Sequence, residues 1–409
     1  MELRPIISSL RHHALTAALL TLQVALTCAI VCNVAFMIAR RIQQVSIPTG
    51  IAENELSVIR SHGTGTDDNA VNAVAQHQTD LAALRAIPGV RSVAAVSYAL
   101  PLNRQDGFGL VCTTPQLSLH SKSCQISSFY DGTPHLIDTL GLHLTAGRDF
   151  RSDEFVSKDN DHPHVVIISR ALADRLYPGQ DAVGKMLYMG RGPNALQVIG
   201  IVADLLRPRL RGPGQNHLSL ITSQLPNSNR DTYVLRSAPT DRERILQAAT
   251  KALFKTDPTR ILDPKYVRTF TQIRAAYFQR DTTMIGLFVA SALGLLFVTA
   301  LGIAGLANFW VQQRRRSIGI RRAVGATRKD ILRYFQTENF LIVTTGVVLG
   351  MALAVTLNLQ LMKHYELPRL PLWYLPIGAL ALEALGQMAV FFPARRASRV
   401  PPLEAIRGQ

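Results

Sequence analysis

Residues 179–185 read Gly-Gln-Asp-Ala-Val-Gly-Lys, which is the GxxxxGK spacing of a phosphate-binding loop. In such a loop, backbone amides and the lysine hold phosphates, and a Ser or Thr after the lysine binds Mg²⁺. Here Met186 occupies that position. The loop also needs a strand before it and a helix after it, whereas residues 169–177 have the apolar spacing of a helix and residues 185–204 alternate like a hairpin. We therefore predict a helix end at the first glycine and a turn at the second, not a nucleotide site.

No other residue pattern in the chain favours catalysis. His135, His143, His162 and His164 fall in one region, but they lack the fixed Cys or His partners of a zinc site. The sequence has no Gly-x-Ser-x-Gly or His-Glu-x-x-His motif and no clustered pair of carboxylates. We therefore expect no catalytic, cofactor or metal site on this chain.

Four apolar runs are each long enough to cross a hydrocarbon core, which takes about 20 residues. Hydrophobic residues make up 47% of the 409 residues and charged residues only 18%, which indicates a membrane protein with a sizeable polar part. The first run is too long for a signal peptide and no small-x-small cleavage site follows it, so we interpret it as an uncleaved span. The runs comprise residues 14–39, 282–310, 339–362 and 371–393.

Basic residues flank these spans on one side of the membrane. Eight Arg and Lys residues lie between the second and third spans, and others follow the fourth span and precede the first. By the positive-inside rule this side is the cytoplasm, which leaves residues 41–281 outside it. Arg40 and Arg41 oppose this orientation, but one basic pair does not outweigh the residues on the other side. The formal net charge of +16 then reflects lipid and cytoplasmic contacts, not nucleic acid, and the GxxxxGK segment lies where ATP is not available as fuel.

The sequence thus predicts an α-helical membrane protein with four transmembrane helices and a large α+β extracytoplasmic domain between helices 1 and 2. Within this domain, residues 79–100, 164–177 and 231–257 each combine a short strand with a helix. We interpret the domain as two related halves with an inserted segment near residues 100–160.

The four cysteines divide between this domain and the first span. Cys112 and Cys124 lie in the inserted segment. Because thiols oxidise outside the cytoplasm, we expect a disulfide between them, the alternative being two free buried thiols. Cys28 and Cys32 are one helical turn apart in the first span, and we expect them to be small packing residues.

Residues 311–338, between the second and third spans, predict a helix, a tight turn and a second helix that continues into the third span. The first helix can extend through Val324, and Gly325 suits the left-handed position just past a helix end. Thr327 and Asp330 have the spacing of a capping box. Apolar contacts between the two helices are expected from Ile318, Val324, Ile331 and Phe335. On spacing alone the segment is either an amphipathic membrane-surface element or a docking element for a cytoplasmic motor.

Small residues predict where the spans pack closely together. Gly346 and Gly350 form a GxxxG pattern in the third span, and Gly294 and Gly302 lie on one side of the second. Glu383, near the middle of the fourth span, is costly in hydrocarbon and should be protonated or face a partner. We expect it to make a structural hydrogen bond and not to form a transport site.

Two of these segments resemble motifs of a known family. Residues 314–339, RRRSIGIRRAVGATRKDILRYFQTEN, are similar to the R-x-E-I-G-[IL]-x-[RK]-A-x-G-A-[ST] signature of FtsX-like permease domains, and residues 393–407, PARRASRVPPLEAIR, resemble their terminal motif. The extracytoplasmic part, including VVIISRALADRLYPGQDAVGKMLYMG, resembles a MacB-type periplasmic core domain. The GxxxxGK stretch is typical of that domain. Ser317 is a departure, because the family usually has an acid there that could form a salt bridge.

The resemblance implies a MacB/FtsX-type ABC transporter permease of the mechanotransmission type, without a fused ATPase domain, in the bacterial inner membrane. Residues 1–40 would hold the cytoplasmic N-terminus and first span, 41–281 the periplasmic domain, 282–393 the FtsX-like permease domain with cytoplasmic loop 311–338, and 394–409 a cytoplasmic tail. ATP and magnesium would bind to a partner ATPase. Further partners would be a second permease chain, identical or paralogous, the lipid bilayer, and a periplasmic adaptor with an outer-membrane channel.

The resemblance also assigns the ATPase contacts to particular residues. The coupling loop would use Ile318, Gly319, Arg321, Arg322, Ala323, Gly325, Ala326, Thr327 and Asp330. A secondary contact would use Arg395, Arg396, Pro402 and Glu404.

The family serves several functions, and the size of the outer domain favours export of peptides, antibiotics or toxins. One alternative is a regulatory or signalling membrane protein that controls cell-wall hydrolases. Another is release of lipoproteins from the membrane. A membrane-bound enzyme is least favoured.

Overall fold

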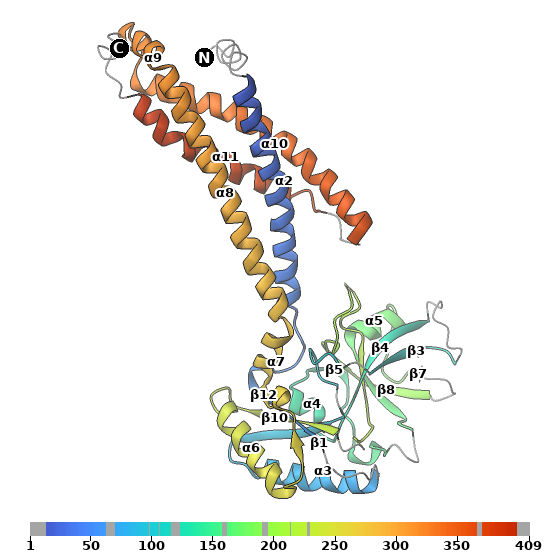
Figure 1. Cartoon of the computed structure of the whole chain (residues 1–409). Helices are drawn as coiled ribbons and strands as arrows, with labels where there is room; N and C mark the ends of the chain where they lie inside the picture. The colour runs from blue at the N-terminus through green and yellow to red at the C-terminus, as the bar shows by residue number, and fades with distance from the viewer. Residues whose placement is uncertain are drawn as a thin grey trace. The chain divides into compact units, whose positions relative to one another are not determined.

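The computed structural model describes residues 14–62, 70–97, 99–105, 107–115, 123–157, 162–189, 195–212, 214–226, 230–365 and 370–398. The chain divides into two compact units (Figure 1). The helical unit contains the described residues up to Ser46 and from Arg280 onward, and the sheet-rich domain contains those within Ile47–Gln279.

Four helices of the helical unit are long and apolar enough to cross a membrane. Each contains most or all of one predicted span, because a long apolar run satisfies its backbone groups in lipid as a helix. These helices are α2 (Ala14–Val45), α8 (Gln279–Gln313), α10 (Arg328–Tyr365) and α11 (Tyr374–Ala397). The short helix α9 (Arg315–Ala323) lies between α8 and α10.

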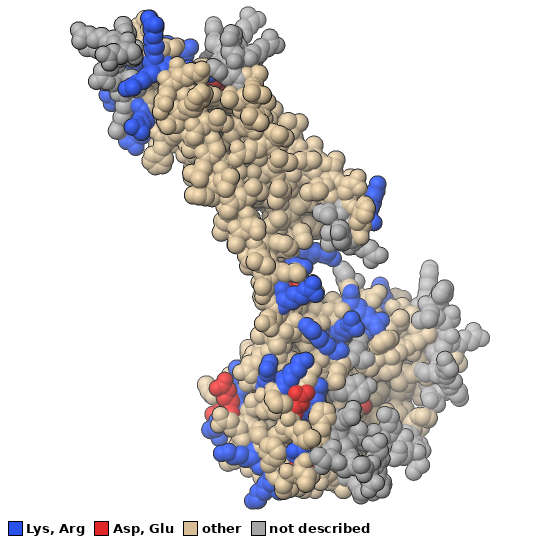
Figure 2. Space-filling model, in the orientation of Figure 1, with Lys and Arg blue, Asp and Glu red and all other residues tan. Residues whose placement is uncertain are grey.

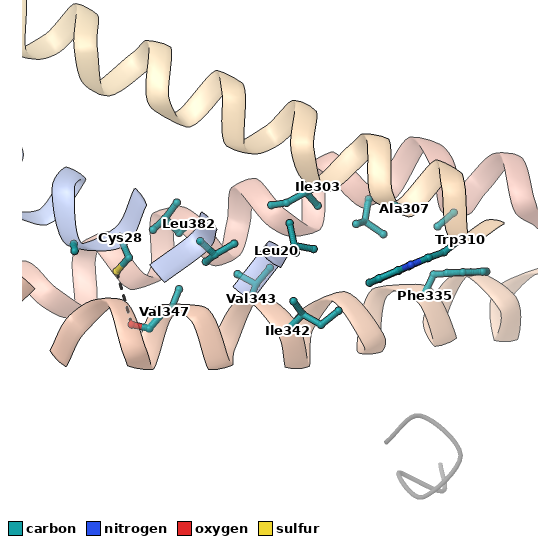
Figure 3. Close-up of a cluster of buried hydrophobic side chains, with 14 of the residues drawn as sticks. Leu20, Cys28, Ile303, Ala307, Trp310, Phe335, Ile342, Val343, Val347 and Leu382 are labelled. Atoms are coloured by element: carbon teal, nitrogen blue, oxygen red, sulfur yellow. Dashed lines mark hydrogen bonds between the residues drawn. The ribbon is translucent and has the colours of Figure 1, made fainter. Parts of the chain in front are cut away.

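The core of the helical unit lies around α2. Leu20 is 1% exposed, and Figure 3 shows it among Ile303 of α8 and Val343 of α10. Further along α2, the Cys28 thiol donates to the carbonyl oxygen of Val347 at 3.8 Å (Figure 3). Cys28 and Cys32 are both free and buried, as expected of packing residues.

Two glycines of α10 allow it to approach α2 closely. A Cβ atom at Gly350 would lie 2.5 Å from Cβ of Cys28, and one at Gly346 would lie 2.8 Å from Cβ of Val24. A Cβ at Gly302 would meet the side chain of Gln23 at 2.7 Å. The prediction is wrong for Gly294 within this chain, because a Cβ there would meet no atom within 4 Å. The outer part of α8 packs on no other described helix at that point.

Hydrogen bonds join polar side chains within and between these helices. The hydroxyls of Thr27 and Thr299 lie 2.8 Å apart and join α2 to α8. Glu383 accepts hydrogen bonds from Gln387 Nε2 at 3.2 Å and from Thr344 Oγ1 at 3.4 Å. The predicted structural hydrogen bond of Glu383 is therefore confirmed.

The first sheet of the sheet-rich domain is antiparallel, with strand order β11-β1-β10-β2, and β12 pairs with β1. Helices α3 (Ala70–Arg85) and α6 (Arg242–Thr256) pack together on it through Leu81, Leu84 and Ile245. The strands are β1 (Leu56–His62), β2 (Val90–Val96), β10 (Arg230–Ser237), β11 (Ile261–Leu262) and β12 (Arg268–Thr269).

A buried ion pair ties α3 to the segment after α6. Arg260 Nη2 donates to the two carboxylate oxygens of Asp80 at 2.8 and 2.9 Å, and the two side chains are 3% and 1% exposed. The hydroxyl of Tyr233, on β10, donates to the same carboxylate at 2.6 Å. The charge of Asp80 is thus compensated by several donors, as burial requires.

The second sheet is mixed and has the order β5-β8-β6-β9-β4-β3-β7. An additional pairing of β7 with β8 closes six of these strands into a ring. The strands are β3 (Gly107–Cys112), β4 (Cys124–Asp131), β5 (Leu144–Gly147), β6 (Val165–Ser169), β7 (Met186–Met189), β8 (Ala195–Val202) and β9 (Ser219–Thr222). All of them lie between β2 and β10 in sequence. An insert limited to residues 100–160 is therefore wrong, because the same sheet continues to Thr222.

Short helices complete the sheet-rich domain. They are α4 (Leu136–Leu140), α5 (Arg170–Leu176), α7 (Phe270–Tyr277) and three 3-10 helices at Glu53–Glu55, Ser152–Glu154 and Pro264–Tyr266. Helix α7 is followed directly by α8.

The GxxxxGK segment connects α5 to β7, so a helix precedes it and a strand follows it. Gly179 and Gly184 have φ angles of 71° and 85°, which glycine adopts without strain. The Lys185 ammonium bonds to the side chain of Gln180 and lies 4.8 Å from the centre of the Tyr177 ring. The predicted helix end, turn and hairpin are confirmed; the hairpin's turn residues 190–194 lie outside the described residues.

Cys112, at the end of β3, and Cys124, at the start of β4, are partners in the antiparallel register. The structure joins them by a disulfide. The bond closes the β3–β4 connection at the edge of the second sheet, next to β7.

Candidate functional site

The arginine-rich bend, defined as residues 314–330, joins α8 to α10. Helix α8 ends at Gln313, and α9 begins after Arg314, whose φ and ψ angles are −98° and 12°. The prediction of one continuous helix through Val324 is therefore wrong. The break at Arg314 gives the bend a short helix of its own.

The turn after α9 has the predicted geometry. Gly325 has a φ angle of 109°, and its N–H donates to the carbonyl of Arg322 while that of Ala326 donates to the carbonyl of Arg321. These bonds satisfy the free carbonyls at the end of α9. The bend therefore ends α9 through backbone hydrogen bonds and a glycine conformation.

A capping box starts α10, as predicted. The carboxylate of Asp330 accepts from the backbone N–H of Thr327 at 2.9 Å and from its hydroxyl at 2.6 Å, and the Asp330 N–H donates back to that hydroxyl at 3.3 Å. Reciprocal bonds of this kind fix the start of a helix. The bend is thus held by local bonds at both of its helix ends.

Apolar residues of the bend divide into a buried and an exposed group. Ile318, Ile331 and Phe335 are 4–5% exposed and belong to the core of the helical unit. Ile320 is 50% exposed and Val324 is 84% exposed. The predicted packing of Val324 against the neighbouring helix is therefore wrong, because its side chain points to solvent at the tip of the bend.

The exposed apolar tip is surrounded by positive charge. Figure 2 shows Lys and Arg gathered at the end of the helical unit that carries α9, beyond a long surface of other residues. Arg321 lies over the ring of Tyr334 at 5.0 Å, which orients its guanidinium. The other basic side chains exposed on the bend are Arg315, Arg316, Arg328 and Lys329.

Arg314 and Glu338 form an ion pair that sequence reasoning missed. Arg314 Nη1 donates to the two carboxylate oxygens of Glu338 at 3.0 and 2.9 Å, and the Glu338 side chain is 1% exposed. The guanidinium also lies 5.9 Å from the centre of the Trp310 ring. Glu338 directly precedes the apolar run 339–362, so the sequence places it at the start of the third span but does not indicate its partner. The one feature that could have indicated an ion pair is an acidic residue next to a membrane span.

The predicted secondary contact is only partly described. Arg395 and Arg396 lie in the last turn of α11 with exposed side chains. Pro402 and Glu404 lie outside the described residues. The structure therefore places two of the four residues.

The arrangement of the bend supports binding and not catalysis. It offers two exposed aliphatic side chains, one on α9 and one at its end, next to a turn fixed by backbone hydrogen bonds and to exposed basic residues of the same bend. Such a surface suits a partner with an apolar groove and acidic rim. We therefore treat the bend as a candidate docking element.

Comparison with known proteins gives two family models that together cover most of the chain. The MacB-like periplasmic core domain matches residues 14–261, and the FtsX-like permease C-terminal domain matches residues 289–402. The second match includes the arginine-rich bend and Arg395 and Arg396.

Several curated relatives are also similar to the chain. The macrolide export ATP-binding/permease protein MacB of Neisseria meningitidis serogroup A is 28% identical over 301 residues, which are 68% of this chain and 43% of the relative. That of Chromobacterium violaceum is 26% identical over 281 residues, 65% of this chain and 41% of the relative. The chain thus spans less than half the length of these relatives.

Among solved structures, the periplasmic region of MacB from Actinobacillus actinomycetemcomitans is 15% identical with a TM-score of 0.33, over 57% of this chain and 97% of that one. At that score the likeness adds nothing to the fold described above. The family models show which family the chain belongs to, since the MacB-like model alone matches more than half of the residues. With its four membrane helices and sheet-rich extracytoplasmic domain, the chain belongs to the MacB/FtsX-type ABC transporter permeases.

Proposed function

We propose that this chain is the permease subunit of a mechanotransmission ABC transporter in the bacterial inner membrane, driven by a separate cytoplasmic ATPase. The relatives' names combine ATP binding with a permease, and this chain spans about 43% of their length. ATP and magnesium would be held by the partner ATPase. The family models support this reading over the regulatory alternative.

The arginine-rich bend is the proposed contact with the ATPase. The observation that carries this proposal is the exposure of Ile320 on α9 and of Val324 at its end, 50% and 84%, next to a turn fixed by Gly325 and the Thr327–Asp330 capping box. Exposed aliphatic groups on a rigid turn lose little conformational entropy when they are buried by a partner. Arg321 and Arg322 would add charge pairs at the rim, with Arg395 and Arg396 as a secondary contact.

A second permease chain is the proposed partner within the membrane. In α8, no residue before Thr299 is buried, and Leu293 and Phe297 are 61% and 64% exposed. Gly294 lies on the same stretch with open space beside it. A small residue flanked by large apolar ones suits close helix–helix approach in lipid. The outer half of α8 is therefore where we place the pairing of two chains.

ATP-driven closure of the ATPases would tilt the spans and move the sheet-rich domains in the periplasm. Because α8 follows α7 directly, a tilt of α8 would be transmitted into the sheet-rich domain by the chain itself. A periplasmic adaptor and an outer-membrane channel would complete an export route for peptides, antibiotics or toxins.

The experiment co-expresses the full chain with an ABC ATPase from the same genome and measures co-purification and ATP hydrolysis. Val324→Asp places a charge at the exposed tip and should abolish both co-purification and stimulation of hydrolysis. Ile261→Asp is the matched control, because Ile261 is an exposed aliphatic residue (59%) in the sheet-rich domain. Unchanged co-purification with Val324→Asp would refute the contact, and equal losses in both variants would refute its specificity.

A further inference from the structure

A groove of about 880 Å³ lies between α8 and α11, toward the ends of these helices that adjoin the bend and Ala397. Its volume falls within the range of small-molecule sites, roughly 300–1,000 Å³. Both helices are candidate membrane spans. If both helices span the membrane, the groove lies within reach of lipid.

The walls of the groove are apolar, and small residues make it wide. Ala304 and Gly305 line it on α8, and Met388 and Phe392 line it on α11. Met388 is 62% and Phe392 is 75% exposed, and a Cβ at Gly305 would meet no atom within 4 Å. No described side chain fills this space. Such walls suit a flexible hydrocarbon chain, which needs no hydrogen bonds.

One end of the groove is polar and positively charged. Asn308 of α8 and Arg395 and Arg396 of α11 line that end, and all three side chains are exposed. Within the described ranges, neither arginine has an acidic partner. The acids of the helical unit that the structure describes are bonded elsewhere: Asp281 to Arg41, Asp330 to Thr327, Glu338 to Arg314 and Glu383 to Gln387.

The two arginines without an acidic partner and the apolar walls together indicate what kind of molecule the groove binds. Guanidinium groups bind phosphate oxygens through paired hydrogen bonds, and basic pockets between membrane helices bind anionic headgroups. A second copy of this chain is a poor occupant, because the described acids at the same end of that copy, Asp330 and Glu338, already bond to its own Thr327 and Arg314. An anionic phospholipid supplies both the phosphate and the hydrocarbon.

We propose that the α8–α11 groove binds an anionic phospholipid from the leaflet on the side of the bend. Its phosphate contacts Arg395 and Arg396, and one acyl chain lies along Ala304, Gly305 and Phe392. The bound lipid joins α8, which leads into the bend, to α11. This inference goes beyond the proposed function, because it requires no ATPase, and it gives to a lipid the two arginines that would otherwise serve the secondary ATPase contact.

The test uses the full chain, purified without an ATPase in neutral detergent, with added phosphatidylglycerol or phosphatidylcholine as probes. Native mass spectrometry counts the lipid that each chain retains. We expect the chain to retain phosphatidylglycerol even when less than one lipid is added per chain, and to retain phosphatidylcholine more weakly. Arg395→Gln/Arg396→Gln should lower the apparent affinity for phosphatidylglycerol by at least about tenfold, since each basic group near a headgroup contributes about 1 kcal/mol.

Two further variants separate the groove from general attraction of charge. Gly305→Leu places a side chain in the groove from a position where a Cβ meets no atom within 4 Å, and it should also lower retention. Arg315→Gln/Arg316→Gln removes the same charge from the bend and should leave retention within about twofold. Equal losses in both arginine pairs would overturn the site, as would unchanged retention in Gly305→Leu. Dissociation of a dimer by Gly305→Leu with lipid retention intact would assign the groove to a second chain and overturn the proposal.

Discussion

Arg314, at the break between α8 and α9, donates through one nitrogen to both carboxylate oxygens of Glu338, at 3.0 and 2.9 Å. The pair joins this break to α10, 24 positions further along the chain. It lies at the point where the second span gives way to the bend. Any movement of the bend must therefore act on α8 and α10 together or break this pair.

Glu338→Gln should destabilise the helical unit strongly. The side chain of Arg314 is only 16% exposed, so its charge would be left without its partner, which costs about 3–5 kcal/mol for a buried pair. Thermal unfolding in detergent, followed by tryptophan fluorescence, measures the effect, because Trp310 lies against Arg314. Arg314→Gln/Glu338→Gln should recover part of the loss. Equal melting temperatures for Glu338→Gln and the unchanged chain would contradict the role of the pair.

Gly350→Ala should destabilise the contact between α2 and α10. Its new methyl group would lie 2.5 Å from Cβ of Cys28 and 2.7 Å from the carbonyl oxygen of Ala25, so the helices must separate. Overpacking of this kind costs about 1–3 kcal/mol. Gly294→Ala is the matched control in a neighbouring span and should be neutral for the chain alone. The melting temperatures of the two variants in detergent measure this difference. A Gly350→Ala chain as stable as the control would refute the close approach of α10 to α2.

The Cys112–Cys124 disulfide predicts the number of free thiols. The chain contains four cysteines, so a chain denatured without reductant should react with two equivalents of a thiol reagent and a reduced one with four. Because the bond closes a short loop, its removal should cost the sheet-rich domain about 2–4 kcal/mol. Cys112→Ser/Cys124→Ser should unfold at lower temperature than the unchanged chain. Four reactive thiols in chain isolated from oxidising conditions would rule the bond out.

Glu154 predicts a loss of stability in acid. Its hydrogen bond from Arg148 is the largest cause of a pKa lowered below the usual 4.5. A lowered folded-state pKa means that the stabilisation is present above pH 4.5 and is lost as pH falls through the folded-state value. Calorimetry of the sheet-rich transition between pH 6 and pH 3 should therefore show a steeper fall for the unchanged chain than for Glu154→Gln. Parallel curves would contradict the contribution of this pair.

The sequence was most informative where structure depends on near neighbours. Gly325, the Thr327–Asp330 box and the hairpin after Lys185 were predictable, because each is fixed within a few residues. The four spans were predictable because lipid requires long apolar helices.

Contacts between distant residues were not predictable in this way. The pairing of Glu338 with Arg314 and the exposure of Val324 depend on where α8 breaks. The extent of the second sheet depends on the parallel pairing of β4 with β9, whose strands are some 90 residues apart. The composition of a segment and the spacing of its apolar residues do not indicate which distant residues it will contact.

The central claim is that the arginine-rich bend contacts an ATPase. The most direct test places a photo-crosslinking amino acid at Val324 in living cells and identifies the linked protein by mass spectrometry. The same residue at Ile261, which is also exposed, serves as the control. We predict that position 324 links to an ABC ATPase and position 261 does not. An ATPase linked at position 261, or only lipid linked at position 324 while the ATPase still co-purifies, would contradict the account.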